Sequence, residues 1–333
     1  MRLIVWLLRL LAGLLIVVTA LPALLALFGF AVPVLDVLNH LQLVLFFGTL
    51  IGLLAAAILR MGRVATVLAL LGFVASAWIF VPEWTSSFAA RPAPPTDGRP
   101  VLRLMTHNMF GLNYDMTRMA AAIKAENPDI VALQEYFPEQ TPLDALLKPD
   151  YPYSVRCQGG KRANLGLYSK IPFDKEMSAA DCPSDAFGKQ RTAHIIAGFT
   201  LSDGTHFSVM TTHMDWPFPT ERQADEFAAV EAAANAVTGP LLVVGDFNST
   251  PWSYAMKGFE VATGLRRETR AVITFPELFT VPSRLVRGGL LHTEPFLPLD
   301  QVFERGIEVS ELHRGEPTGS DHLPVIFSFS VAK

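Results

Sequence analysis

Three long apolar stretches occupy the first part of the chain, and none contains an ionisable residue. They predict three transmembrane helices, at Leu10–Phe30, Leu41–Leu59 and Val64–Val81, because each is about long enough to cross the ~30 Å hydrocarbon layer of a bilayer. A cleaved signal peptide is the alternative for the first stretch, which follows Arg2 and Arg9. The run is too long for a signal peptide, and two further spans come after it.

The arginines beside these spans predict an orientation. Arg2 and Arg9 precede the first span, and Arg60 and Arg63 lie between the second and the third. The link between the first and second spans has no Lys or Arg. Because positive residues stay on the cytoplasmic side, we expect a multi-pass protein of the inner or plasma membrane whose C-terminal part is extracytoplasmic.

A region rich in proline and glycine, RPAPPTDGRP at 91–100, follows the spans and reads as a stiff linker. The predicted organisation is therefore a membrane domain at 1–84, a linker at 85–100 and one globular domain at 101–333.

Strand-like and helical runs alternate within this globular domain. Helices are expected at 116–126, before Asn127-Pro128, and from the capping box Thr220–Gln223 to about Val237. Strands are expected at 101–109, 129–135, 151–157, 163–170, 193–201, 206–214, 241–248, 299–303 and 323–330. Many strands and few helices predict an α+β domain whose sheets pack face to face.

Charge and cysteine content narrow the functional classes. After residue 100 the chain has 21 Lys+Arg and 28 Asp+Glu, a net charge of −7, which disfavours binding to a DNA backbone. The two cysteines, Cys157 and Cys182, lie in the domain expected outside the cytoplasm. In an oxidising compartment they are expected to form a disulfide; two unpaired buried thiols are the alternative.

Several predicted strands end in polar residues that a hydrophobic core would not select. Strand ends open onto a common rim, so residues far apart in sequence can converge there. In GDFN the Asp and the Asn are two apart and share one face of an extended chain. Each residue alone has a structural alternative, as a surface, turn or strand-end side chain, but the set favours a function. The set is Asn108, Glu135, His213, Asp246, Asn248, Asp300, Asp321 and His322.

This combination of side chains suits the hydrolysis of a phosphoester. Crowded carboxylates repel one another unless a cation neutralises them. Oxygen ligands without cysteine favour Mg²⁺, ahead of Ca²⁺ or Mn²⁺. Zinc is disfavoured because no Cys cluster or paired His motif accompanies the two histidines. Amides and histidines supply the donors that a phosphoryl transition state needs.

Four motifs in this order resemble the endonuclease/exonuclease/phosphatase superfamily, which includes deoxyribonucleases, inositol-polyphosphate 5-phosphatases and bacterial sphingomyelinases. They are QE at 134–135, TH at 212–213, GDFN at 245–248 and SDH at 320–322. The resemblance covers residues 101–330. It implies a four-layer sandwich, in which two packed β-sheets are flanked by helices, preceded here by the three transmembrane helices.

The resemblance also implies a metal site. Glu135 would be the main Mg²⁺ ligand, assisted by Asn108, with Asp321 on the metal side and Mn²⁺ as a substitute. Apurinic-site endonucleases have a carboxylate where this chain has Phe110, which weakens any second metal position.

The remaining roles follow from the same resemblance. Asp246 would orient or deprotonate the attacking water, and Asn248 would hold a phosphate oxygen. His213 would contact the phosphate and assist the leaving group. His322, oriented by Asp300, would donate to the non-bridging oxygens.

The substrate must be inferred from other features, because the family does not choose it. A membrane tether raises the effective concentration of lipid-borne esters. Trp216 and Phe218 follow the TH motif, and the apolar segment 275–298 carries Arg284 and Arg287. We therefore expect the substrate to be a lipid-linked or membrane-derived phosphoester, and we expect membrane lipids to surround the predicted transmembrane helices. An extracytoplasmic nuclease is the alternative, and an inactive membrane scaffold is a third reading that the intact site residues disfavour.

Overall fold

The described part of the chain forms two compact units. The computed structural model describes residues 2–86, 88–89, 92–158, 164–182, 193–270, 272–281 and 289–332. The membrane unit consists of Met1–Ala89, Pro217–Glu221 and Ser249–Gly258, and the sandwich unit consists of the remainder from Ala90 onward. The sequence assigned the two short segments of the membrane unit to the globular domain.

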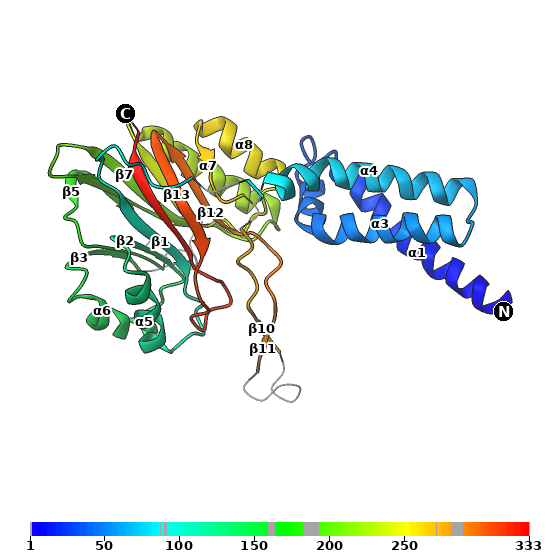
Figure 1. Cartoon of the computed structure of the whole chain (residues 1–333), viewed down its shortest axis with the longest axis horizontal. Coiled ribbons are helices and arrows are strands. Elements are labelled where there is room, and N and C mark those ends of the chain that lie inside the picture. Colours follow the sequence, from blue (N-terminus) through cyan, green and yellow to red (C-terminus); the bar gives the residue numbers. More distant parts are fainter. Residues whose placement is uncertain are drawn as a thin grey trace. The chain divides into compact units, whose positions relative to one another are not determined.

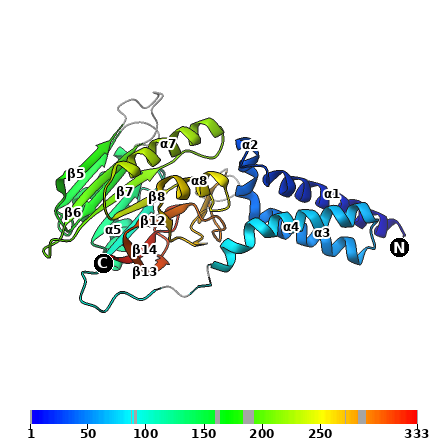
Figure 2. The ribbon, with the colours of Figure 1, turned by 90° about the horizontal axis from the view of Figure 1, so that it is seen from above.

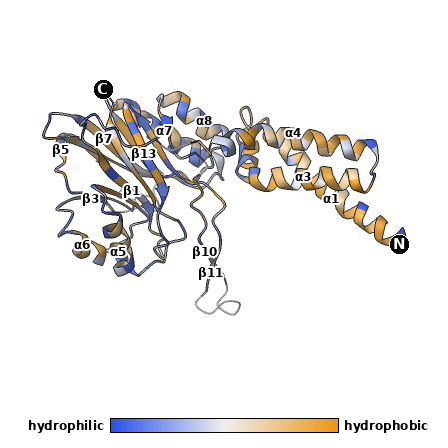
Figure 3. Ribbon diagram, viewed as in Figure 1, coloured by the Kyte–Doolittle hydropathy of each residue, from blue (hydrophilic) through white to orange (hydrophobic). Residues whose placement is uncertain are grey.

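The membrane unit contains three helices long and apolar enough to cross a membrane, as the sequence predicted. They are α1 (Arg2–Ala26), α3 (Gln42–Ile58), which continues from the short α2 (Pro33–Asp36) and η1 (Val37–Leu41), and α4 (Arg63–Ser86). Figure 3 shows hydrophobic residues along most of their length. These helices are candidate membrane spans.

Small residues bring these three helices close together. A Cβ atom at Gly72 would lie 2.4 Å from the Cβ of Ala20, and one at Gly48 would lie 2.5 Å from Cγ2 of Thr19. Large apolar side chains such as Val44 instead face outward and are exposed. This arrangement is typical of helices in lipid, where close backbone contact replaces a hydrophobic core.

The positive residues gather at one end of this helix bundle. Arg9 Nε donates to the Leu59 carbonyl at 3.0 Å, so the start of α1 lies beside the link that contains Arg60 and Arg63. The connection between the first two spans lies at the opposite end of the helices.

The sandwich unit is built on two six-stranded sheets (Figure 1). The first has the order β13 (Ile307–Arg314), β14 (Val325–Val331), β1 (Leu102–Asn108), β2 (Ile130–Gln134), β4 (Leu165–Ser169), β3 (Tyr153–Cys157). The second has the order β5 (Asp174–Asp181), β6 (His194–Thr200), β7 (His206–His213), β8 (Leu241–Asp246), β12 (Asp300–Arg305), β9 (Arg266–Arg267). A separate hairpin consists of β10 (Leu278–Thr280) and β11 (Leu290–His292).

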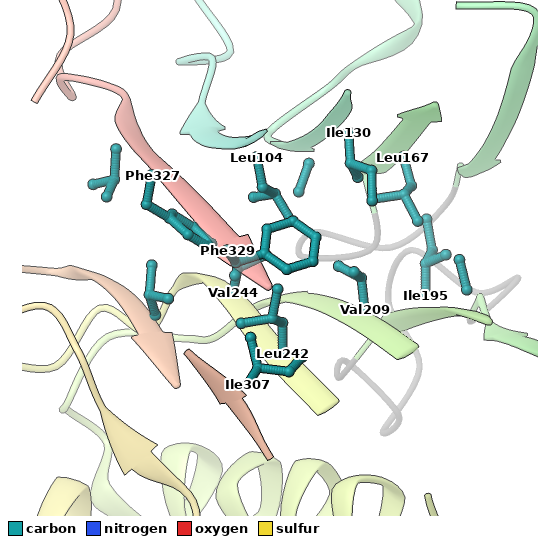
Figure 4. Packing of buried hydrophobic residues seen from close by; sticks show 14 of the residues in the cluster. Leu104, Ile130, Leu167, Ile195, Val209, Leu242, Val244, Ile307, Phe327 and Phe329 are labelled. Atoms are coloured by element: carbon teal, nitrogen blue, oxygen red, sulfur yellow. The ribbon is translucent and has the colours of Figure 1, made fainter. Parts of the chain in front are cut away.

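The two sheets pack face to face over one hydrophobic core. Leu104 and Phe327 of the first sheet meet Val209 and Val244 of the second (Figure 4). These side chains alternate with residues that face away from the core, because successive residues of a strand point to opposite faces. The core therefore fixes which side chains face the space between the sheets.

Helices cover the outer faces. The helices α5 (Met116–Glu126) and α6 (Pro142–Leu147), with the short η2 (Pro138–Gln140) between β2 and α6, lie on the first sheet. The helices α7 (Thr220–Ala236) and α8 (Tyr254–Thr263) lie on the side of the second (Figure 2). The predicted four-layer sandwich is confirmed.

Some elements escaped the sequence analysis. β5 and β13 are edge strands, and β13 has only one buried face, so polar residues interrupt its pattern. The short helices α6 and α8 were also not predicted.

A disulfide joins the two sheets at their edges. Cys157 ends β3, an edge strand of the first sheet, and Cys182 follows β5, an edge strand of the second. The two residues are bonded, with their Cα atoms 5.0 Å apart. Among the described residues there is no free cysteine.

Candidate active site

The polar strand ends meet at one edge of the sandwich unit. In the first sheet, Asn108 at the end of β1 pairs with Gln134 at the end of β2, next to Glu135. In the second sheet, Asp246 at the end of β8 lies between His213 of β7 and Asp300 of β12. Parallel pairing of β1 with β2 and of β7 with β8 brings these ends to the same edge. Asp321 and His322 lie in the loop that leads into β14.

The GDFN segment depends on its glycine. Gly245 has φ = 144°, and a Cβ there would lie 2.0 Å from the Thr212 carbonyl oxygen. Phe247 is fully buried, with its ring centroid 5.0 Å from that of Phe303. The close approach to β7 and this aromatic contact turn Asp246 and Asn248 toward the site.

Asp246 is the centre of the site. It is 1 % exposed and accepts hydrogen bonds from Asn108 Nδ2 at 2.9 Å and from the Asn248 amide at 2.8 Å. Its Oδ2 lies 3.6 Å from Nε2 of both His213 and His322. Burial outweighs the nearby His322 and raises the pKa of Asp246 to about 7. The carboxylate is therefore held by donors from both sheets.

His322 forms a buried pair with Asp300. His322 Nδ1 donates to Asp300 Oδ2 at 2.7 Å. Burial by itself would lower the pKa of His322, but the carboxylates of Asp300 and Asp246 outweigh it and raise the pKa to about 10. His322 Nε2 lies 3.6 Å from Asp246 Oδ2, and a protonated imidazole can donate from this atom to an anionic oxygen.

His213 and Asn248 lie on the opposite side of Asp246. Asn248 Nδ2 donates to the Met214 carbonyl at 2.8 Å and lies 3.3 Å from His213 Nε2. His213 Nε2 is also 3.9 Å from Glu135 Oε1. These contacts bring His213 and Asn248 beside the acidic residues Glu135 and Asp246.

Glu135 occupies the more open part of the site. Its Oε2 accepts from the Gly111 amide at 2.9 Å, and its φ is 53°. Burial, with a contribution from the Glu135 charge, raises the pKa of Asp321 to about 6. Glu135, Asp321 and the amide oxygen of Asn108 are the oxygen ligands that the sequence predicted for a metal ion.

This donor set fits a divalent metal ion. Oxygen ligands from two carboxylates and one amide suit a hard cation. Asp246, Asp300 and His322 also place one ligand atom each within 4.8 Å of one another. In this second group, His322 Nδ1 is already engaged by Asp300.

The structure adds residues that the sequence analysis left without a role. Ser320 Oγ donates to the Asn108 carbonyl at 2.7 Å and accepts from the His322 amide at 3.0 Å. Gln134 Nε2 binds Thr211 Oγ1 at 3.0 Å across the two sheets. Both belong to the motifs SDH and QE, so their positions in those motifs were the available signal.

Aromatic and apolar side chains border the site. The ring centroids of Phe275 and His322 are 4.7 Å apart, and those of Trp216 and Phe275 are 6.0 Å apart. The β10–β11 hairpin extends away from the two sheets (Figure 1) and exposes Phe279 and Leu291. Arg284 and Arg287, which the sequence analysis considered, lie outside the described residues.

Residues 105–322 match the Endonuclease/Exonuclease/phosphatase family. The match covers more than half of the chain and includes all eight candidate residues. The chain therefore belongs to this family, whose members are metal-dependent phosphoesterases. The resemblance and the enzyme class inferred from the sequence are confirmed.

Two relatives share part of the chain. The UPF0294 protein of Vibrio cholerae serotype O1 is 30 % identical over 139 residues, covering 40 % of this chain and 44 % of that protein. The UPF0294 protein of Vibrio parahaemolyticus is 29 % identical over 136 residues, covering 40 % and 43 %. The match thus spans less than half the length of these relatives.

Solved structures share the fold at low identity. An endonuclease/exonuclease/phosphatase family protein from Bacteroides thetaiotaomicron has a TM-score of 0.55 at 17 % identity, covering 71 % of this chain and 99 % of that one. D. rerio TDP2, complexed with a single-strand DNA product, has a TM-score of 0.54 at 16 % identity, covering 69 % and 99 %.

Proposed function

We propose that the protein is a membrane-anchored, Mg²⁺-dependent phosphoesterase that hydrolyses a lipid-linked or membrane-derived phosphoester on the outer side of the membrane. The observation that carries the hydrolytic role is the cluster around Asp246, where a buried carboxylate, an amide and two histidines meet within hydrogen-bonding or ion-pair distance.

The residues divide the chemistry among themselves. Asp246 orients the attacking water and accepts its proton. His322, held by Asp300, donates to the non-bridging phosphate oxygens, where negative charge develops. Asn248 holds another phosphate oxygen, and His213 assists the leaving group.

Glu135, Asn108 and Asp321 would hold the metal ion, which supplies Lewis-acid neutralisation of the phosphate charge. Mn²⁺ is the expected substitute for Mg²⁺, since both accept oxygen ligands. Holding the metal on the Glu135 side leaves His322 to bind the phosphate.

The aromatic border supports a lipid-linked substrate. Trp216 and Phe275 extend an apolar surface from His322, and Phe279 and Leu291 of the hairpin are exposed. Such side chains favour a substrate with an apolar portion. The membrane helices keep lipid substrates close.

Two observations support the proposed membrane orientation: the position of the arginines and the disulfide of the sandwich unit. Arg9, Arg60 and Arg63 lie at one end of the helix bundle, and the positive-inside rule places that end in the cytoplasm. The Cys157–Cys182 disulfide supports an oxidising compartment for the sandwich unit.

A nuclease remains the second candidate. The similar fold of D. rerio TDP2, solved with a single-strand DNA product, favours it. The net charge of −7 after residue 100 opposes it. An inactive scaffold is disfavoured because the site residues converge.

A substrate panel with the full chain in lipid nanodiscs tests this function. Plasmid DNA, RNA, phospholipids and polyprenyl pyrophosphate are compared with Mg²⁺, with excess EDTA, and after Mn²⁺ is added back. We expect a lipid ester to be hydrolysed fastest, EDTA to abolish turnover, and either ion to restore it.

Glu135→Gln should weaken Mn²⁺ binding, measured by electron paramagnetic resonance, whereas Glu139→Gln at an exposed neighbouring position should not. Faster turnover of DNA or RNA than of every lipid would establish the nuclease instead. Full activity in excess chelator would remove the metal from the mechanism.

A further inference from the structure

A chain of buried polar side chains extends from the connection between the first two long helices of the membrane unit to α3 and α4. Asn39 Nδ2 donates to Asp36 Oδ1 at 2.8 Å, and Gln42 Nε2 donates to Asn39 Oδ1 at 2.8 Å. Ser76 Oγ of α4 donates to Gln42 Oε1 at 2.7 Å. All four residues are at most 8 % exposed. Polar groups within membrane helices are costly, and they commonly mark a function.

This polar chain ends on the first turn of α8. Asp36 Oδ1 accepts from the Tyr254 amide at 2.8 Å, and Asp36 Oδ2 accepts from the Ala255 amide at 2.9 Å. Amides in the first turn of a helix have no partner within the helix, and the positive end of the helix dipole favours a carboxylate there. Asp36, far away in sequence, therefore caps this helix.

A second contact is made at Thr250, four residues before Tyr254. His40 Nδ1 accepts from the Thr250 amide at 3.1 Å and lies 3.0 Å from Thr250 Oγ1. Trp252, which is 3 % exposed, packs against Ile79 and Phe80 of α4. Within the membrane unit, the connection between the first two helices thus contacts segment 249–255 near both of its ends, and α4 adds an aromatic contact in the middle.

The held segment directly follows a catalytic residue. Asn248 has φ = 47°, a conformation that non-glycine residues rarely adopt. Its amide donates to Asp246, and Thr250 comes two residues later. The direction in which the chain leaves Asn248 therefore bears on the geometry of the Asp246–Asn248 turn.

We propose that Asp36 and His40, in the connection between the first two membrane helices, are positioning residues that hold segment 249–255 and so keep Asp246 and Asn248 in place for catalysis. The inference rests on the proposed function. The membrane helices are then part of the catalytic structure as well as an anchor.

Four variants of the full chain in nanodiscs test the proposal. Asp36→Ala and His40→Ala remove the two acceptors. His40→Asn keeps an acceptor, because the Asn amide oxygen takes nearly the position of His Nδ1. Val34→Ala, at an exposed residue beside Asp36, is the matched control.

Two measurements are made on each variant. One is kcat and KM for bis(p-nitrophenyl) phosphate and for the fastest substrate of the panel. The other is hydrogen exchange at single-residue resolution, which needs no activity. We expect kcat to fall about tenfold in Asp36→Ala and His40→Ala, with KM changed less than about twofold, because small displacements of reacting groups slow turnover strongly. Exchange should become faster at Thr250, Tyr254 and Ala255, and also at the Asn248 amide. His40→Asn and Val34→Ala should resemble the wild type.

Faster exchange that stops at Thr250 and leaves Asn248 unchanged would overturn the proposal, as would faster exchange with kcat unaltered. A wild-type protein that hydrolyses no ester contradicts the proposed function, and the exchange of the Asn248 amide then still decides whether the turn is held by the membrane unit. If one alanine variant unfolds, with fast exchange throughout, the comparison of His40→Asn with the other alanine variant carries the test.

Discussion

At the scale of single residues, the site is built on unusual backbone conformations. Six non-glycine residues among those described have positive φ, and three of them, Phe110, Glu135 and Asn248, lie at the site. Such conformations cost energy and persist only where the surroundings enforce them. Here the enforcing contacts include the Gly111 amide on Glu135 and the carboxylate of Asp246 on the Asn248 amide.

The roles proposed for Asp246 and His322 give the first prediction at this scale. Asp246→Asn and His322→Ala should each lower kcat by at least about 10²-fold, equal to about 2.7 kcal/mol of barrier. The first removes the proton acceptor, and the second removes a cationic donor. Steady-state kinetics on the fastest substrate measure both.

The controls are Asp225→Asn and His313→Ala, at exposed positions. Circular dichroism and melting curves show whether each variant folds. A folded Asp246→Asn protein with near-normal kcat would contradict the role given to Asp246.

At the scale of elements, the candidate site and the disulfide lie in different parts of the two sheets. The candidate site residues that lie within strands belong to β1, β7, β8 and β12, none of which is an edge strand. The edge strands β3 and β5 contain none of them, and the disulfide joins Cys157 of β3 to Cys182, which directly follows β5. The bridge therefore acts on the stability of the sandwich, and it leaves the residues of the site untouched.

Removing this bridge gives the prediction at this scale. The double variant Cys157→Ser, Cys182→Ser should lower the free energy of unfolding by about 3 kcal/mol, since the bridge closes a loop with a sequence separation of 25 and restricts the unfolded chain. Denaturant unfolding of the full chain in detergent, followed through the sandwich fluorescence, measures the change.

The kcat of the double variant, measured well below its melting temperature, should stay within about twofold of the wild type. A double variant as stable as the wild type would show that the two sheets do not need the crosslink. The wild type in a reducing buffer is the matched comparison.

At the scale of the whole molecule, three candidate membrane spans precede the sandwich unit in the sequence. If α4 crosses the membrane, the residues that follow it lie on the side opposite to Arg60 and Arg63. The orientation therefore constrains which esters the enzyme meets.

The prediction at this scale is that the sandwich unit is extracytoplasmic. A reporter that works only in an oxidising setting, fused after Lys333, should be active. Cys157 and Cys182 should resist alkylation until a reductant is added. Protease added to intact spheroplasts should remove the domain. The physical reason is that Lys and Arg near membrane ends set the orientation.

Arg91 and Arg99, which follow the third span, oppose this orientation. Arg2, Arg9, Arg60 and Arg63 lie close to the opposite ends of the spans. We expect these four arginines to outweigh Arg91 and Arg99. A domain protected from protease, together with an active cytoplasmic reporter, would reverse the orientation and remove the outer-leaflet substrate.

The sequence by itself determined the features that depend on local pattern. Apolar length defined the three candidate spans, and period-two runs with a terminal polar residue located β1, β2, β7, β8 and β12 within a few residues. The candidate site could be predicted because its members belong to short motifs, GDFN and SDH among them, whose order is itself a signal.

Only the tertiary structure decided the contacts between distant segments. No local pattern links His40 with Thr250 or Asp36 with α8, because these pairs are more than 200 residues apart. The sequence placed Asp36 and His40 in the link between the first two predicted spans. A hydrogen bond depends on the distance between two groups in space, and for groups this far apart along the chain only the folded arrangement of the helices sets that distance.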